Sequence, residues 1–260
     1  MWLALMQIDL AELVQSGGEL FWLWIAAGGF VLATIYFLYL AITGGSENRH
    51  HYLNSTIIVL WAAIWYVLMG SGNGVSLVEI TEEGARIFYW GRYIEWLVAT
   101  PLLLLGLSWV GLGGSVGNQQ RTVAYLLGAD VLMVLTGLFA GLTGGGFRWF
   151  WFIISVIFLV AVLYLLWNWL RAAAQQGNPE GGFGLFYTLA SLLTVVLVLY
   201  QVVWFLGQSG IMFFSSGWEV FFYAALDIAG MIAFGVILLH GVREASSQGR
   251  PAGRRTSRVS

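Results

Sequence analysis

The chain has 260 residues, of which 59% are hydrophobic and only 9% are charged, and its mean hydropathy is +0.82. A soluble domain carries roughly a quarter charged residues, so lipid must surround most of this surface. The net charge of -2 excludes an electrostatic case for a nucleic-acid partner, and the absence of cysteine excludes disulfides, thiolate metal sites and a cysteine nucleophile.

Seven apolar stretches, separated by short glycine-rich or polar breaks, make up most of the chain. Because about 20 apolar residues span the bilayer core, each stretch is predicted to be a transmembrane helix. In chain order the predicted spans are residues 19–43, 53–70, 86–112, 122–143, 147–171, 183–207 and 216–242. The predicted fold class is an all-α bundle of seven transmembrane helices.

Three segments outside the spans have patterns of their own. Residues 75–87 alternate apolar and polar side chains around Glu-Glu-Gly, which predicts a small β-hairpin in the second loop. Residues 1–18 are amphipathic and are expected to lie along the extracellular membrane surface. Residues 244–260, after the transmembrane domain 19–243, form an Arg/Gly/Ser-rich tail without an apolar pattern.

The arginines predict the orientation of the bundle. If the spans alternate in direction, Arg49, Arg121, Arg171 and the tail arginines lie at one end, and the glutamates of residues 79–83 lie at the other. The positive-inside rule then places the N-terminus outside and the C-terminus in the cytoplasm of a multi-pass cell-membrane protein.

Four ionisable residues deep within the predicted spans, and a fifth near the outer end of the last span, are candidates for function because charge is costly in a membrane. They are Arg92 and Glu95 in the third span, Asp130 in the fourth, and Glu219 and Asp227 in the seventh. Arg92 and Glu95 are three residues apart and share a helix face, as a structural ion pair or as part of a site. Asp130 is either a hydrogen-bonding contact between helices or a site residue.

The residues around these charges resemble microbial (type 1) rhodopsins. The third span reads YWGRYIEWLVATPLLLLGL and is similar to the third helix of that family. Further similar motifs are LLGADVLMVLTGL in the fourth span, LYQVVWFLG in the sixth and LDIAGMIAFGVILL in the seventh. The resemblance covers the chain from about residue 50 to residue 243 and implies the seven-helix rhodopsin fold.

The resemblance implies roles for several residues. Glu95 is similar to the primary counterion and proton acceptor, Asp227 to the second counterion, Arg92 to an outward gating arginine, and Glu219 to a proton-release acid. The family's retinal-pocket positions fall on Trp96, Thr100, Met133, Phe152, Ser155, Leu197, Tyr200, Gln201, Trp204 and Tyr223.

One position departs from the family's chemistry. The lysine that forms the retinal Schiff base in the family corresponds to Met231, and the sequence contains no lysine at all. Because Schiff-base formation needs a primary amine, the composition predicts that covalent retinal is absent. Arg92 alone then faces Glu95 and Asp227, so either Glu95 is neutral or a cation or cationic ligand balances it. Gly106 stands where outward proton pumps of the family keep a carboxylic donor.

These features leave several functions open. One is a non-enzymatic membrane protein, for example a sensor, that binds a retinoid, a carotenoid or haem non-covalently, with Met231 as a candidate haem ligand or as core filler. A second is an ion or proton transport protein related to light-driven pumps but lacking the chromophore linkage. A third is a partner subunit of another rhodopsin. The family resemblance also implies a homo-oligomer, either a trimer or a pentamer.

Overall fold

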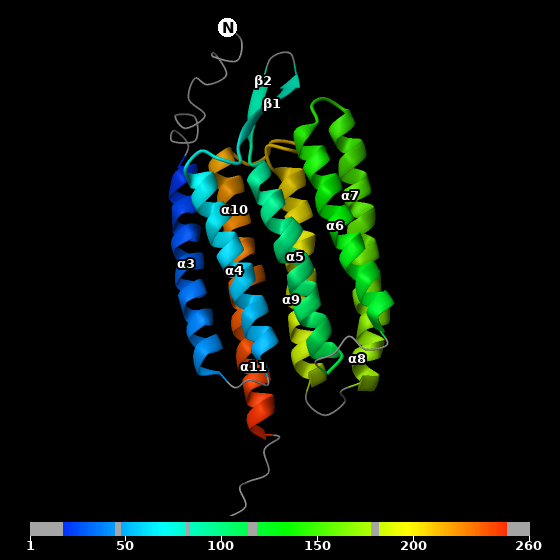
Figure 1. Ribbon diagram of the computed structural model, residues 1–260. Coiled ribbons are helices and arrows are strands. Elements are labelled where there is room, and N and C mark those ends of the chain that lie inside the picture. Colours follow the sequence, from blue (N-terminus) through cyan, green and yellow to red (C-terminus); the bar gives the residue numbers. More distant parts are fainter. Residues whose placement is uncertain (1–17, 45–47, 82–83, 114–118, 178–181, 249–260) are drawn as a thin grey trace, which may run out of the picture.

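The structure, a computed structural model, describes residues 18–44, 48–81, 84–113, 119–177 and 182–248. Within these ranges seven helices are long and apolar enough to cross a membrane, which confirms the predicted fold class. Figure 1 shows them as one upright bundle with a β-hairpin at one end, called here the hairpin end. Residues 1–17 of the predicted surface segment, and the tail beyond residue 248, lie outside the described residues.

Five of the spans are single helices and two contain a π-helical turn. The single helices are α3 (Glu19–Thr43), α4 (Arg49–Gly70), α5 (Trp90–Gly111), α6 (Gln120–Leu142) and α9 (Gly182–Leu206). The fifth span consists of α7 (Phe147–Tyr164), the π turn η3 (Leu165–Leu170) and α8 (Arg171–Gly177). The seventh consists of α10 (Ser216–Asp227), the π turn η4 (Ile228–Ala233) and α11 (Phe234–Gln248).

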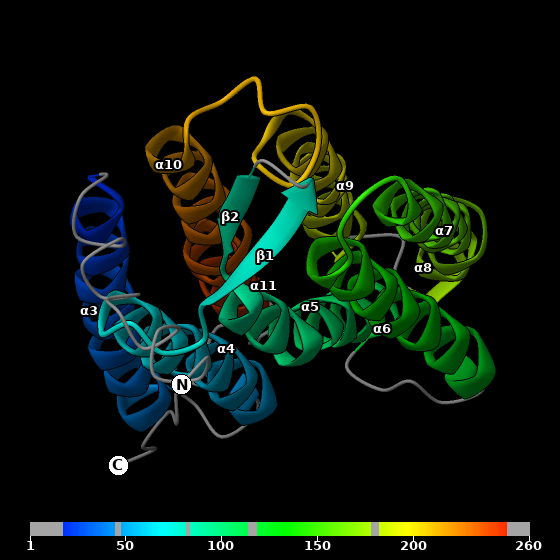
Figure 2. The ribbon, with the colours of Figure 1, turned by 90° about the horizontal axis from the view of Figure 1, so that it is seen from above.

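Helix α5 has the most buried position in the bundle. It packs against α4, α6 and α9, whereas α10 packs against both α3 and α9 and so brings the first and last spans together (Figure 2). Of the seven spans, α5 has the largest buried share of its apolar window, 61%. This explains how α5 can carry charged residues, because its polar groups face protein rather than lipid.

The predicted hairpin is confirmed and corrects one helix boundary. Strands β1 (Ser76–Thr81) and β2 (Gly84–Phe88) are antiparallel, with Ser76 opposite Phe88 and an irregularity between Glu79 and Thr81. Because β2 pairs with β1 up to Phe88, the third span begins at Trp90 and not at the predicted residue 86.

The start of the second span is also corrected. Helix α4 begins at Arg49 rather than at residue 53, so His50 and His51 belong to its first turn. His51 is 4% exposed, and both imidazole rings pack against the indole of Trp109 on α5, with centroid distances of 5.1 and 5.9 Å. His50 and His51 were predicted to lie outside the span because local hydropathy does not show that an aromatic ring from another helix packs against them.

Candidate functional site

Asp227 is the most heavily hydrogen-bonded acid at the centre of the bundle. Asp227 is the last residue of α10, and its side chain is fully buried. The hydroxyls of Tyr66 on α4 and Tyr200 on α9 each donate to it at 2.5 Å, and the indole Nε1 of Trp96 on α5 donates at 2.9 Å. Three donors from three helices stabilise a carboxylate, so this position is built to hold a negative charge.

Glu95 has the opposite environment. Its side chain is 0% exposed, and neither carboxyl oxygen has a hydrogen-bond partner among the described residues. Arg92, one turn earlier on α5, places its guanidinium 4.3 Å from the ring centroid of Tyr223 and 5.5 Å from that of Tyr89. The structure therefore brings the predicted charge cluster of Arg92, Glu95 and Asp227 together, with only Asp227 fully hydrogen-bonded.

A cavity of about 30 Å³ lies beside this cluster, between α5, α6, α7 and α9. Nine of the predicted pocket residues line it: Trp96, Thr100, Met133, Ser155, Leu197, Tyr200, Gln201, Trp204 and Tyr223. Tyr93, Val134 and Gly137 complete the lining. The tenth predicted residue, Phe152, does not line the cavity. Its ring stacks on Trp204 with centroids 4.3 Å apart and an interplanar angle of 10°, so it supports a wall from behind.

One end of the cavity is polar. The amide Nε2 of Gln201 donates to the hydroxyl of Ser155 at 3.1 Å, and that hydroxyl donates to the carbonyl of Met133 at 2.9 Å. This chain of hydrogen bonds joins α9, α7 and α6. It satisfies polar groups that would otherwise be costly in an apolar pocket.

Asp130 forms a hydrogen bond with the neighbouring helix α5, which is one of the two roles predicted for it. The Thr100 hydroxyl lies 2.7 Å from the Asp130 carboxyl and 2.9 Å from the Trp96 carbonyl. The single hydrogen of the Thr100 hydroxyl is donated to Asp130 or shared between these two oxygens. The hydrogen bond between Thr100 and Asp130 links α6 to α5.

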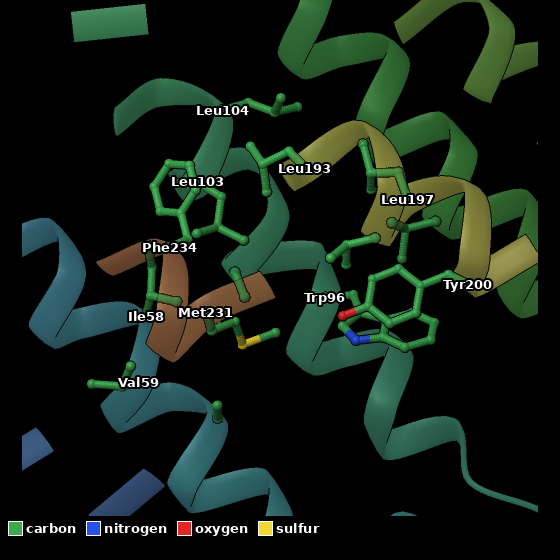
Figure 3. Close-up of a cluster of buried hydrophobic side chains, with 14 of the residues drawn as sticks. Ile58, Val59, Trp96, Leu103, Leu104, Leu193, Leu197, Tyr200, Met231 and Phe234 are labelled. Carbon is green, nitrogen blue, oxygen red and sulfur yellow. The ribbon is translucent and has the colours of Figure 1, made fainter. Parts of the chain in front are cut away.

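Met231 belongs to the packed core rather than to the cavity wall. It lies in the π turn η4, four residues after Asp227, and is 1% exposed. Figure 3 shows its side chain in a cluster with Ile58 and Val59 of α4 and Trp96 of α5. A π turn widens the helix locally and is common at functional sites. Met231 thus follows Asp227 by about one turn, and its thioether packs within the apolar core.

A second, smaller cavity continues toward the hairpin end. It is about 10 Å³ in volume and is bordered by Arg92, Tyr223, Ser209, Ser216 and Glu219 among others. The Glu219 carboxylate accepts the backbone N–H of Gln208 at 2.7 Å. The predicted site acid Glu219 is therefore on the same side of Arg92 as this cavity, away from Glu95.

Several buried polar residues at the hairpin end were not predicted. Tyr89 donates to the buried carboxylate of Glu19 at 2.6 Å, which ties α3 to the start of α5. Burial raises the pKa of Tyr89, and the charge of Glu19 raises it further. Arg86 on β2 is 4% exposed. Burial lowers the pKa of Arg86. No pattern in the sequence pairs Glu19 with Tyr89, because 70 residues separate them.

The comparisons with known proteins agree with this geometry. The Bacteriorhodopsin-like protein family matches residues 17–245. The chain belongs to this family. It is 38% identical to a bacteriorhodopsin from a Haloterrigena species over 228 residues, which are 86% of this chain and 88% of that protein. It is 35% identical to cruxrhodopsin-3 of Haloarcula vallismortis, covering 91% of this chain and 96% of that protein.

Solved rhodopsin structures have the same fold. The thermophilic rhodopsin of Rubrobacter xylanophilus superposes with a TM-score of 0.82 at 38% identity, covering 88% of this chain and 97% of that chain. The light-driven proton pump rhodopsin of Coccomyxa subellipsoidea superposes with a TM-score of 0.79 at 31% identity, covering 86% and 96%. Membership of the microbial rhodopsins, predicted from the motifs, is confirmed.

The comparisons overturn the predicted cofactors. The expectation was a retinoid or carotenoid held non-covalently, or haem, in place of covalent retinal. The related proteins and structures are rhodopsins, a family that binds retinal covalently, so the cofactor to which they point is retinal. Met231 is not retained as a haem ligand. The composition of the chain still offers no lysine for a covalent link to retinal, since none of its 260 residues is lysine.

The residues present fit retinal in part. The aromatic walls formed by Trp96, Tyr200 and Trp204 suit a conjugated chain, which stacks between flat rings. The attachment point does not fit, because the Met231 thioether is not an amine and cannot form an imine.

Proposed function

We propose that this protein is a proton-transporting membrane protein related to light-driven pumps but lacking the chromophore linkage. The observation that carries the proposal is the buried cluster of Arg92, Glu95 and Asp227, with Tyr66 and Tyr200 both donating to Asp227. Ionisable groups are retained inside a bilayer at a cost, and they mark ion or proton paths. The similarity to the solved structure of a light-driven proton pump also supports a role in proton transport.

The half of the bundle toward the hairpin end offers a proton route. Neither carboxyl oxygen of Glu95 has a hydrogen-bond partner in the part of the chain that the structure describes, so this acid can release a proton and take one up again. Arg92 separates Glu95 from the small cavity, and Glu219 on the far side of Arg92 provides the next carboxylate. A shift of the Arg92 guanidinium between the two carboxylates would couple proton uptake at Glu95 to release near Glu219, because each acid is stabilised in its charged form by the arginine.

The other half of the bundle is a barrier. A third cavity, of about 10 Å³, is bordered there mainly by Leu103, Leu104, Leu193, Val196 and Leu197. At Gly106 a Cβ would meet the Asn54 amide at 3.0 Å, so even the smallest side chain would crowd Asn54. With no carboxylic donor at Gly106, uptake of a proton from this end is expected to be slow.

Restoring an amine tests the proposal. Met231→Lys protein, supplied with all-trans retinal in lipid vesicles, is expected to form a coloured pigment and to move protons in the light. Adding Glu95→Gln should leave colour but lower proton movement by about a hundredfold, because the acceptor is lost. The measurements are the visible absorption spectrum and the pH change of the vesicle suspension.

A second lysine position provides the matched control. Met133 lines the central cavity from α6, so Met133→Lys places an amine in the pocket, but not one turn after Asp227 as Met231→Lys does. It should not support light-driven proton movement. A coloured Met231→Lys pigment that moves no protons under illumination would contradict the proposed function.

A further inference from the structure

Glu19 is a buried acid outside the central charge cluster. It is the first residue of α3, at the hairpin end of the bundle (Figure 1), and it is 1% exposed. The hydroxyl of Tyr89, the residue just before α5, donates to its carboxylate at 2.6 Å. Because a carboxylate is a strong acceptor, this bond fixes the direction of the Tyr89 ring. It also joins the first span to the start of the third.

The same tyrosine ring is in contact with Arg92. Tyr89 precedes Arg92 by three residues, and the guanidinium carbon of Arg92 lies 5.5 Å from the centre of the Tyr89 ring. It also lies 4.3 Å from the centre of the Tyr223 ring on α10. A cation over an aromatic face is attracted by the π electrons of the ring. The guanidinium is therefore held by one ring from each of two helices.

These ring contacts are important because Arg92 has few stronger ones. Its side chain is 3% exposed, and its Nε and Nη2 atoms have no hydrogen-bond partner among the described residues. Arg92 borders the small cavity together with Tyr89, Tyr223 and Glu219. When hydrogen bonds do not fix a buried cation, its position depends on the aromatic faces beside it.

Glu19 acts on the Tyr89 ring in two ways. Its carboxylate holds the phenol hydroxyl in place, and the hydrogen bond polarises the phenol so that the ring attracts a cation more strongly. Burial raises the pKa of Tyr89, and the charge of Glu19 raises it further, so the phenol keeps its proton and stays a donor. The charge of Glu19 thus reaches Arg92 through the ring between them.

We propose that Glu19 is a positioning residue for Arg92 and acts through the ring of Tyr89. The pair of Glu19 and Tyr89 holds the guanidinium beside the small cavity that contains Glu219. It sets the position from which Arg92 moves toward Glu95. That movement rests on the proposed transport function, whereas the positioning itself requires neither retinal nor transport.

A double-mutant cycle measures whether Glu19 acts on Arg92. The midpoint of thermal unfolding, Tm, is recorded for the purified full-length protein and for Glu19→Gln, Arg92→Gln and the double variant. Arg92→Gln should be more destabilising by about 2 °C in the native background than in Glu19→Gln protein, because the two residues are coupled. Strictly additive changes in Tm would overturn the proposal.

Tyr89→Phe separates an action through the ring from direct attraction between the two charges. It keeps the ring and removes the hydroxyl, so the coupling of Glu19 with Arg92 should disappear in this background. Coupling that survives Tyr89→Phe would be direct and would contradict the proposed role of the ring. Arg86→Gln is the matched control, because Arg86 is also buried at the hairpin end but lies 5.6 Å from the ring of Phe88. Its effect should be additive with that of Glu19→Gln.

Nuclear magnetic resonance of the Arg92 side chain gives a readout that does not depend on stability. Aromatic rings shift protons above their faces upfield, so in the unmodified protein the N–H signals of Arg92 should lie upfield of those of the tail arginines. Glu19→Gln and Tyr89→Phe should each reduce this shift, and the conservative variant Glu19→Asp should retain most of it.

Arg92 signals without an upfield shift, or with one that Glu19→Gln leaves unchanged, would overturn the proposal. None of these measurements uses retinal or a proton gradient. A failure here would therefore leave the proposed transport function standing, and a failure of Met231→Lys protein to move protons would leave the positioning role standing.

Discussion

At the centre of the bundle two acids of similar burial have very different surroundings. Asp227 accepts hydrogen bonds from Tyr66, Tyr200 and Trp96, whereas neither oxygen of Glu95 has a partner among the residues that the structure describes. Arg92 supplies one positive charge for the two acids. Since an unpaired buried charge is unfavourable, we predict that the negative charge resides on Asp227 and that Glu95 carries a proton at rest.

Infrared spectroscopy can count the neutral acids. We expect two carboxylic C=O bands from the buried interior, from Glu95 and from Asp130, and Glu95→Gln and Asp130→Asn should each remove one. Met231→Lys should also remove the Glu95 band, because the ammonium group adds the second positive charge. Loss of a band in Asp227→Asn but not in Glu95→Gln would show that the charges are assigned the wrong way round.

At the scale of elements, the hairpin is held onto the bundle by close backbone contact as well as by Arg86. A Cβ atom at Gly141 of α6 would overlap the ring of Phe88, the last residue of β2. Phe88 is 4% exposed, so this ring fills the space between hairpin and helix. The hairpin therefore acts as a packed cover for the small cavity that contains Glu219, rather than as a free loop.

This contact predicts a position-specific cost. Gly141→Ala should lower the free energy of unfolding by about 1–3 kcal/mol, because the Phe88 ring must move out of a packed site. Gly146→Ala is the control in the same turn, since nothing lies within 4 Å of a Cβ there. Thermal unfolding of the two variants should differ by several degrees. Equal Tm values would mean that the ring can shift at no cost.

At the scale of the whole molecule, charge is distributed unevenly between the two ends. Arg49, Arg171 and Arg243 lie at the end opposite the hairpin, while Arg86 and Arg148 lie at the hairpin end and donate to backbone carbonyls. The end opposite the hairpin is predicted to face the cytoplasm. The oligomeric state, a predicted trimer or pentamer, also belongs to this scale and stays a prediction.

The absence of cysteine makes the orientation easy to measure. Gln176→Cys places a single thiol on an exposed position of α8, and Ser215→Cys places one at the hairpin end, before α10. In intact cells a membrane-impermeant maleimide should label Ser215→Cys and not Gln176→Cys. After lysis both should react. The reverse pattern in intact cells would invert the predicted topology.

The sequence by itself determined the class of protein and most of the elements. Apolar stretches of about 20 residues can only be satisfied in a bilayer as helices, so seven spans followed from composition and length. The motif around Glu95 and the one around Asp227 predicted which residues would gather at the centre. The hairpin followed from alternation, although its last residues were assigned to the helix after it.

Tertiary structure decided what those residues do to one another. Only the packing of α4, α5 and α9 around α10 could give all three hydrogen bonds to Asp227 and leave Glu95 without a partner in the described ranges. Phe152 was placed in the pocket by its position in the sequence, and packing turned its ring behind Trp204. The hydrogen bond from Arg86 to the carbonyl of Gly141 joins residues that are 55 positions apart in the chain. Contacts of this kind depend on side-chain direction and helix packing, which local periodicity does not encode.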